Sequence, residues 1–331
     1  MFIFPLIIDI FIGLFTNKSM RIYQDLSEVS HNNNSIVTLG TFDGIHLGHR
    51  KIIDEVVKKA ALLGGRSFLI TFYPHPRKII SREKKIELLS TPSEKAKMIE
   101  SLGIENMLII KFDKDFSQLN PDKFLEKYIV NGIGAKEVVI GYDHHFGKGR
   151  GGDISFLQKK GSESGFEVTV IPAYDIDGVA ISSSKIRRAI LEGDIKRANK
   201  YLGRFYSFSG KVIRGDKRGR ELGFPTANLE IENSDKLLPA IGIYAVEFIV
   251  KEKKHFGLLS VGKRPTFYAA GDIVPEVYIY DFDENIYDEF VTVNVVERIR
   301  GEEKFSSADE LVKQMNNDKK VGIEILKKLN N

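Results

Sequence analysis

The sequence of 331 residues contains no cysteine. This absence excludes disulfides, thiolate metal sites and cysteine nucleophiles, and it fits a cytoplasmic protein. A cluster of charge of one sign is also missing, because lysine and arginine are interleaved with aspartate and glutamate and the net charge is only +4. We therefore expect small-molecule substrates and no nucleic-acid partner.

A long hydrophobic run is missing as well. The apolar stretch at residues 1–15 is too short for an ordinary membrane span, and it lacks the basic start and the small-residue cleavage site of a signal peptide. We interpret residues 1–19 as an extension outside the fold that results from a miscalled start. A weak membrane anchor is the alternative. An edge strand is expected to begin at Arg21.

The most specific pattern lies at residues 40–49, where an apolar strand turns into a helix. Its three glycines allow the backbone to approach a ligand, and the N-terminus of the following helix favours an anion. His46 and His49 are three residues apart, so both are placed to donate to phosphate oxygens at the helix entrance. The alternative is that the two histidines are ordinary surface or capping residues.

Short apolar strands alternate with helical patterns from residue 35 to about residue 202. The strands are expected at residues 35–39, 66–73, 107–111, 138–140 and 168–171, and the helices at residues 50–63, 93–102, 121–130 and 154–160. This alternation predicts an α/β domain with a Rossmann-like parallel sheet, helices on both faces, and ligands at the carboxyl ends of the strands.

Two polar segments of this region are candidates for the same nucleotide pocket. Residues 141–150 follow a strand and are suited to cap the pocket; a metal site of Asp143, His144 and His145 is a less favoured reading. At residues 182–187, three serines stand at a helix start and Arg187 follows, so hydroxyls and a guanidinium are available to a triphosphate. Taken alone, this second segment is equally a helix cap with a basic face.

Beyond residue 204, short strands and turns predict a small antiparallel β-barrel with a C-terminal helix at residues 307–329. The strands are expected at residues 206–214, 243–250, 255–260, 274–280 and 291–296. A glycine-rich and cationic loop at residues 210–220 suits phosphates. Thr226 and Asn228 are two apart, so their oxygens share one face of an extended segment and suit Mg²⁺.

These motifs, spread over residues 20–326, resemble those of the bacterial bifunctional riboflavin kinase/FAD synthetase family. Its nucleotidyltransferase half is matched by Gly-x-Phe-Asp-Gly-x-His-x-Gly-His, Phe-Tyr-Pro-His-Pro, Gly-Lys-Gly-Arg and Ser-Ser-Ser-x-Ile-Arg. Its kinase half is matched by Gly-Arg-x-Leu-Gly-Phe-Pro-Thr-Ala-Asn and by residues 264–267 and 276–282. The resemblance implies an FMN adenylyltransferase (FAD synthetase) domain at residues 20–203 and a riboflavin kinase domain at residues 204–331.

The resemblance also implies two reactions in sequence. ATP first phosphorylates riboflavin to FMN in the C-terminal module, and a second ATP then adenylylates FMN to FAD in the N-terminal module, releasing pyrophosphate. Riboflavin, FMN and ATP are the implied substrates, and Mg²⁺ is the implied cofactor. The oligomeric state is left open.

The family's functional residues map onto particular positions of this sequence. Glu276 is implied as the base for the ribityl hydroxyl, Thr226 and Asn228 as the residues that hold Mg²⁺, and His46 and His49 as catalytic groups that stabilise the reacting phosphates. The implied nucleotide-binding residues are Gly40, Phe42, Asp43, Gly44, Ser182, Ser183, Ser184, Arg187, Gly210, Lys211, Gly215, Gly219, Thr226 and Asn228. Asp143 and Arg300 are implied as flavin-binding. Ser260, Tyr278 and Asp288 depart from the family pattern, which puts contacts by those side chains in doubt.

Two other classes of protein remain open. A tRNA-charging enzyme of the His-x-Gly-His superfamily shares the opening motif, but it requires a lysine-rich second signature and a tRNA-binding domain that residues 182–187 and a small barrel do not supply. A non-catalytic flavin- or nucleotide-binding regulator is expected to have lost Thr226, Asn228, Glu276 or the histidines, and all of these are present.

Overall fold

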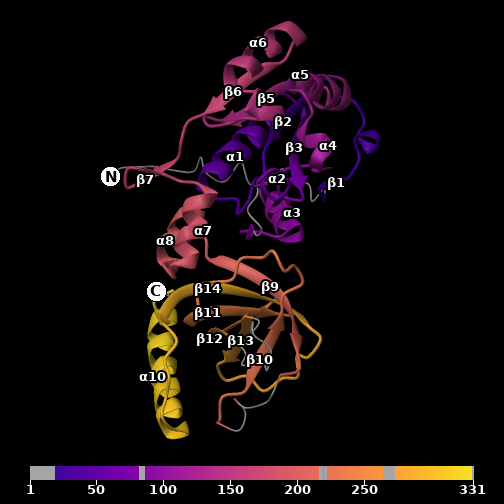
Figure 1. Cartoon of the computed structure of the whole chain (residues 1–331). Coiled ribbons are helices and arrows are strands. Elements are labelled where there is room, and N and C mark those ends of the chain that lie inside the picture. Colours follow the sequence, from indigo (N-terminus) through magenta and orange to yellow (C-terminus); the bar gives the residue numbers. More distant parts are fainter. Residues whose placement is uncertain (1–18, 82–85, 216–218, 220–221, 264–272, 330–331) are drawn as a thin grey trace, which may run out of the picture. The chain divides into compact units, whose positions relative to one another are not determined.

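The computed structural model describes residues 19–81, 86–215, 219, 222–263 and 273–329 (Figure 1). The predicted extension therefore lies outside the described residues except for Ser19, and so do residues 216–218 and 220–221 of the predicted phosphate loop and the 264–267 motif. In the described part of the chain, no helix combines the length and the apolarity needed to cross a membrane.

Contacts divide the chain into two compact units. The sheet unit comprises the described residues of Met1–Phe42, His49–Arg82 and Ala96–Pro172. The barrel unit comprises those of Asp43–Gly48, Glu83–Lys95 and Ala173–Asn331. Part of the 40–49 motif therefore belongs to the barrel unit. This division is based on contacts between residues, whereas the predicted division is based on sequence patterns. The modules at residues 20–203 and 204–331 therefore remain a prediction.

The sheet unit is built on a six-stranded sheet in which all neighbouring strands are parallel. In spatial order the strands are β1 (Arg21–Tyr23), β4 (Asn106–Lys111), β3 (Arg66–Tyr73), β2 (Ser35–Leu39), β5 (Ala135–Gly141) and β6 (Glu167–Ile171). All five residues of β2 are buried. Strands covered on both faces read as continuous apolar runs, which explains why the sequence predicted this sheet correctly.

Helices accompany the strands of the sheet, and most of their residues belong to the sheet unit. They are α1 (Leu47–Leu62), α2 (Pro76–Ile80), α3 (Pro92–Ser101), α4 (Lys114–Ser117), α5 (Pro121–Phe124) and α6 (Ile154–Ser164), with 3₁₀ turns at Leu26–Glu28 and Lys148–Arg150. Helices α1 and α3 each begin in the barrel unit. The helix expected at 121–130 is only partly α-helical, because α5 continues as a π-helix over Leu125–Ile133. Gly134, with φ of 78°, ends this segment in the left-handed conformation that glycine adopts easily.

The barrel unit contains a closed antiparallel barrel, as predicted. Around the barrel the strands are β9 (Tyr206–Ile213), β10 (Thr226–Glu230), β13 (Ile273–Ile279), β12 (Lys253–Lys263), β11 (Gly242–Val250) and β14 (Phe290–Arg300), which returns to β9. The C-terminal helix α10 (Ala308–Lys327) lies against β11, β12 and β14. Leu326 of this helix packs with Ala245 and Val296.

Two further helices and a small hairpin complete the barrel unit. They are α7 (Ser183–Leu191), α8 (Ile195–Leu202), β7 (Asp175–Ile176) and β8 (Val179–Ala180). Ile186 and Ile190 of α7 share one apolar core with Tyr206 and Phe208 of β9. The serine and arginine motif that starts α7 is thus fixed by the packing of the barrel unit.

Candidate active sites

The turn after β2 places three residues in the left-handed backbone region. They are Phe42 (φ 45°), Gly44 (φ 84°) and Ile45 (φ 41°). Phe42 and Ile45 are each only 2% exposed. A bulky or β-branched residue in this region costs about 1–3 kcal/mol, so surrounding contacts have to hold the turn in shape. It is not an ordinary connection between a strand and a helix.

Asp43 is the anchor of this turn within the barrel unit. Its carboxylate accepts the backbone N–H groups of Leu89 at 3.1 Å and Ser90 at 3.0 Å, and it pairs with Arg187 at 2.5 Å. Burial raises the pKa of Asp43, but the neighbouring cations and the two backbone donors together lower it by more. The pKa of Asp43 therefore lies below its usual value. The carbonyl oxygen of Asp43 accepts the hydroxyl of Ser183 at 2.9 Å.

The serine and arginine motif reaches this anchor in part. The hydroxyl of Ser182 accepts a backbone N–H of α7 and is its N-cap, which was one of the two roles considered for it. Ser184 is exposed. Arg187 points its guanidinium at Asp43, and its Nε donates to the carbonyl oxygen of Glu87 at 2.8 Å. A phosphate contact by Arg187 stays a prediction that has to accommodate these two partners.

His46 is buried in the same turn and is 6% exposed. Burial lowers its pKa to about 4; Asp43 raises the pKa in part, and Arg204 lowers it again. The imidazole is therefore uncharged at neutral pH and carries one N–H donor. A Cβ at Gly48 would lie 3.3 Å from the His46 ring, so the backbone approaches this side chain closely. Arg204 Nη2 also donates to the carbonyl oxygen of Gly44 at 2.7 Å.

The other residues of the predicted adenylyl-transfer site belong to the sheet unit. The N–H of Gly40 donates to a carbonyl oxygen of β3 at 3.0 Å. His49 lies in the first turn of α1, where its ring meets Phe42 edge to face with centroids 5.1 Å apart. Asp143 is exposed after β5. Among the described residues no three His, Asp or Glu side chains are grouped to hold a metal, which leaves the metal site considered at residues 143–145 unsupported.

The predicted adenylyl-transfer residues form one constellation. The second consists of the predicted kinase residues Thr226, Asn228 and Glu276, and it lies on the outer face of β10 and β13. Asn228 is opposite Glu276 across this strand pair, and Thr226 is opposite Tyr278. Thr226 Oγ1 donates to Glu276 Oε2 at 3.1 Å. Val277 packs into the barrel core, so its neighbour Glu276 faces outward together with Thr226 and Asn228. The structure thus brings together the three residues predicted for the kinase reaction.

Three predicted phosphate-loop glycines stand where no side chain fits. A Cβ at Gly215 would lie 2.3 Å from Nδ2 of Asn228, whose side chain is buried. A Cβ at Gly219 or Gly210 would lie 2.3 Å or 2.7 Å from a backbone carbonyl oxygen. The backbone around Asn228 is therefore packed at a distance that only glycine allows.

The residues that depart from the family pattern have contacts of their own. Asp288 adopts φ of 67°, a conformation that glycine adopts at no steric cost, and it pairs with Lys211 at 2.7 Å. The hydroxyl of Tyr278 lies 3.2 Å from Nζ of Lys319 and accepts its hydrogen. Ser260 lies in β12, opposite the predicted base of β13. Lys211 is thus paired with Asp288 at the surface, and its phosphate contact remains a prediction.

Arg300 is held by α10. Its guanidinium makes three contacts of 2.8 to 3.0 Å with the carboxylate of Asp318, whose side chain is 3% exposed. The Phe305 ring centroid lies 5.7 Å from the guanidinium carbon. This pair fixes the C-terminal helix to the end of β14. A flavin contact of Arg300 remains a prediction.

Sequence reasoning missed the segment that holds the Asp43 turn. Lys95 is 8% exposed, and burial lowers its pKa to about 8 while Asp43 opposes that shift. The only feature that the sequence showed in this segment was the start of the helix expected at residues 93–102. Thr91 and Glu94 form a capping box at the start of α3, with reciprocal hydrogen bonds of 3.0 Å and 3.2 Å.

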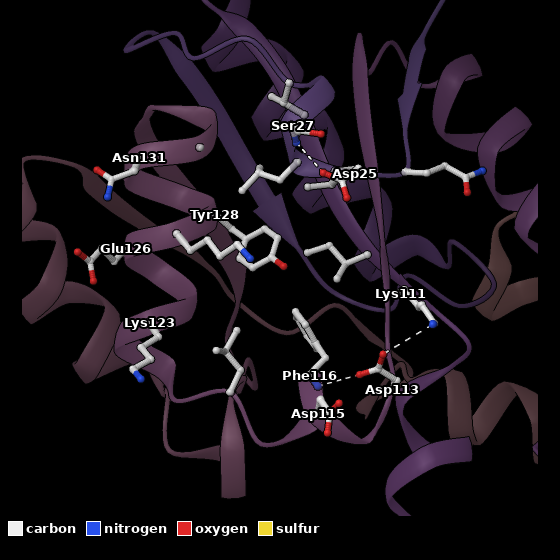
Figure 2. A pocket seen from close by; sticks show the side chains of 18 of the residues that line it. Asp25, Ser27, Lys111, Asp113, Asp115, Phe116, Lys123, Glu126, Tyr128 and Asn131 are labelled. Atoms are coloured by element: carbon white, nitrogen blue, oxygen red, sulfur yellow. Dashed lines mark hydrogen bonds and ion pairs between the residues drawn. The ribbon is translucent and has the colours of Figure 1, made fainter.

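The sheet unit contains a cavity of about 1150 Å³, and Figure 2 shows the side chains that line it. It lies at the carboxyl ends of β1 and β4, where Leu108, Ile110 and Phe116 give it an apolar lining and Asp113 and Tyr128 contribute polar groups. None of the site residues predicted from the sequence lines it. The cavity is therefore separate from both constellations.

The comparisons with known proteins follow the order of the two constellations. Residues 28–185 match the FAD synthetase family, and residues 202–326 match the riboflavin kinase family. The bifunctional riboflavin kinase/FMN adenylyltransferase of Listeria monocytogenes is 38% identical over 286 residues, which cover 86% of this chain and 90% of that protein. The Bacillus subtilis protein of the same name is 37% identical over 299 residues, 89% of this chain and 93% of its own length.

A solved structure agrees over nearly the whole chain. The crystal structure of a macrolide-efflux protein from Streptococcus pneumoniae superposes with a TM-score of 0.84 at 32% identity. The match covers 92% of this chain and 98% of that one. The chain therefore has the same fold as that protein over most of its length.

Proposed function

Because the chain belongs to the family of bifunctional riboflavin kinase/FMN adenylyltransferases, we propose that it converts riboflavin to FMN and then FMN to FAD, with ATP as the donor in both steps. One observation carries the kinase assignment. The hydroxyl of Thr226 donates to the carboxylate of Glu276 on the same strand pair that presents Asn228.

In the kinase step, Glu276 is proposed to take the proton from the ribityl hydroxyl of riboflavin. The freed oxygen bonds to the γ-phosphorus of ATP, the bond from that phosphorus to the bridging oxygen breaks, and ADP leaves. Thr226 orients the carboxylate of Glu276 through its 3.1 Å hydrogen bond. Such transfers depend mainly on positioning and on charge neutralisation.

The donor set of this face fits Mg²⁺, which prefers hydroxyl, amide and carboxylate oxygens. Thr226 and Asn228 supply a hydroxyl and an amide oxygen from alternate positions of β10, beside the carboxylate of Glu276. These residues are proposed to hold the ion, which supplies charge neutralisation at the transferring phosphates when bound. Gly215 and Gly219 are proposed to keep the backbone close enough for the nucleotide.

In the adenylyl-transfer step, an FMN phosphate oxygen is proposed to bond to the α-phosphorus of ATP while pyrophosphate leaves. The FMN phosphate is already an anion, so no base is needed. His46 and His49 are proposed to donate to the phosphate oxygens, and uncharged His46 has one N–H for this role. Asp43 is proposed to hold the turn through its bonds to Leu89, Ser90 and Arg187, and a direct nucleotide contact of Asp43 remains a prediction of the sequence. A cytoplasmic location and independence from nucleic acid remain predictions of the sequence.

Separate assays of the two half-reactions test this function. The purified chain is incubated with ATP and MgCl₂ and either riboflavin or FMN, and the flavins are separated by chromatography. We expect FMN and later FAD from riboflavin, and FAD directly from FMN. If neither flavin is converted while ATP and Mg²⁺ are in excess, the proposal is wrong.

A further inference from the structure

One segment of the barrel unit, residues 86–95, holds the Asp43 turn from one side. The N–H groups of Leu89 and Ser90 donate to the Asp43 carboxylate, and the N–H of Gly44 donates to the Ser90 hydroxyl at 3.0 Å. Arg187, the partner of Asp43, is itself held by a backbone carbonyl of this segment. Since the turn contains residues in costly backbone conformations, these hydrogen bonds keep it in one shape.

The same segment is bound to the barrel on its other side. Leu88 pairs with the loop after β10: its N–H donates to Asp235 at 2.6 Å and its carbonyl oxygen accepts the N–H of Leu237 at 2.9 Å. Glu94 accepts the N–H of Ser209 in β9 at 3.1 Å. Residues 86–95 therefore have backbone partners both in the Asp43 turn and in the barrel.

Lys236 closes this connection. Its ammonium group donates to the carbonyl oxygens of Leu89 at 2.8 Å and Ser207 at 2.7 Å and to the Glu94 carboxylate at 2.6 Å. The side chain is only 1% exposed, and these three hydrogen bonds use all three donors of the ammonium group. Burial lowers its pKa, and Glu94 opposes that shift. Tyr206 adds its ring at 4.8 Å.

Leu89 connects the Asp43 turn directly to Lys236. Its N–H bonds to Asp43, and its carbonyl oxygen bonds to Lys236. Neither Lys236 nor Glu94 belongs to either constellation, so an effect on chemistry has to pass through the Asp43 turn. A buried ion pair contributes little net stability, whereas loss of one partner leaves an uncompensated buried charge and is costly.

Resting on the proposed function, we propose that Glu94 and Lys236 are positioning residues for adenylyl transfer. Through residues 86–95 they hold the Asp43 turn in its working shape, so the barrel that presents the kinase residues also sets the geometry of the second reaction. Thr226 and Glu276 bond to each other, whereas the barrel partners described above for residues 86–95 lie in β9 and in the loop after β10. We therefore expect the dependence to run in one direction.

The test is Lys236→Met, with both half-reactions measured on the same preparation of the full chain. We expect kcat for FAD formation from FMN to fall at least about tenfold, because a small misplacement of catalytic groups is enough to cause such losses. Riboflavin phosphorylation is expected to change less than about twofold. The matched control is Lys196→Met, which removes an exposed lysine of the same unit that pairs with the partly exposed Glu297 at 2.8 Å.

The kinase reaction serves as an internal report on folding. Lys236 lies in the barrel, so a purely structural role predicts that Lys236→Met lowers riboflavin phosphorylation at least as much as FAD formation. If both activities fall together, Glu94→Gln decides, because it keeps the size of the side chain and removes the charge. Equal losses there, or full FAD formation in either variant, overturn the inference. An inactive wild-type protein would instead overturn the proposed function.

Discussion

The carboxylate of Asp43 and the guanidinium of Arg187 lie 2.5 Å apart although 144 residues separate them in the sequence. Their side chains are 1% and 14% exposed. The sequence assigned the motifs of Asp43 and Arg187 to a single nucleotide site. The structure brings these two residues together through an ion pair between their own side chains. The pair fixes a strained turn beside His46.

We expect Asp43→Asn to lower the free energy of unfolding by about 3 kcal/mol or more, since breaking a buried pair leaves an uncompensated charge. FAD formation should fall with it. Urea unfolding and the FMN assay measure the two effects. Asp177→Asn is the matched control, because Asp177 pairs with Lys200 at the same distance of 2.5 Å but is exposed. Equal stability losses in both variants would contradict the account of the turn.

We expect Glu276→Gln to reduce riboflavin phosphorylation at least about 100-fold, because it removes the proposed base and keeps the shape of the side chain. FAD formation from supplied FMN should be nearly unchanged. Glu289→Gln, at a half-exposed carboxylate of the same barrel that pairs with Lys251, should alter neither reaction. Equal loss of both activities in Glu276→Gln would refute the model of two sites.

The reverse pattern is expected for His49→Ala. It should lower FAD formation from FMN about 100-fold, since it removes a donor to the reacting phosphates, and leave riboflavin phosphorylation intact. His31→Ala removes an exposed histidine of the sheet unit and is the control. FAD synthesis at the wild-type rate in His49→Ala would remove this residue from the proposed machinery.

His46 gives the stability a defined pH dependence. Its pKa is about 4 in the folded protein and 6.5 as a reference, so the unfolded chain binds more protons between these values. Stability is then full above pH 6.5 and is lost as the pH falls toward 4, by on the order of 1.4 kcal/mol per pH unit. Burial lowers the pKa of His144 to about 4 as well, so it adds in the same direction.

Urea unfolding between pH 7 and pH 5 measures this slope. We expect His46→Gln to have a smaller slope than the wild type, because Gln does not titrate. His31→Gln should keep the wild-type slope, since His31 is exposed. Identical slopes in His46→Gln and the wild type would show that His46 is not buried in its neutral form.

The packing of Gly215 against Asn228 predicts a selective kinase defect. Gly215→Ala would place a Cβ 2.3 Å from the Asn228 amide and displace it, so we expect the KM for ATP in riboflavin phosphorylation to rise about tenfold. FAD formation from FMN should not respond. Gly262→Ala is the control, because no atom lies within 4 Å of a Cβ there. An unchanged KM in Gly215→Ala would separate Asn228 from the nucleotide.

Local sequence patterns were sufficient for much of the fold. The apolar run of β2 indicates a strand buried on both faces, and it predicted the parallel sheet. The alternation in β13 indicates a strand buried on one face, and it predicted the barrel. The spacing of Thr226 and Asn228 placed two oxygens on one face for the same reason. The family match then decides among the classes that the sequence left open, and the expected enzyme class is confirmed.

The partners of buried charges could not be predicted in this way. The resemblance implied a flavin contact for Arg300, and the serine and arginine motif a phosphate contact for Arg187. Both remain predictions, but neither the resemblance nor the motif gave the carboxylates that these residues pair with, Asp318 and Asp43. Lys236 gave no signal, because a lone lysine in a loop is usually exposed. Such pairings depend on tertiary packing over long sequence separations, which periodicity does not report.

The most direct test of the central claim follows the phosphates of ATP. The protein is incubated with riboflavin, Mg²⁺ and ATP radiolabelled at either the γ- or the α-phosphate, and FMN and FAD are separated. Two reactions in sequence predict that γ-label enters FMN and stays in FAD, whereas α-label enters FAD only. Label from the α-phosphate in FMN, or FAD without γ-label, would contradict the account.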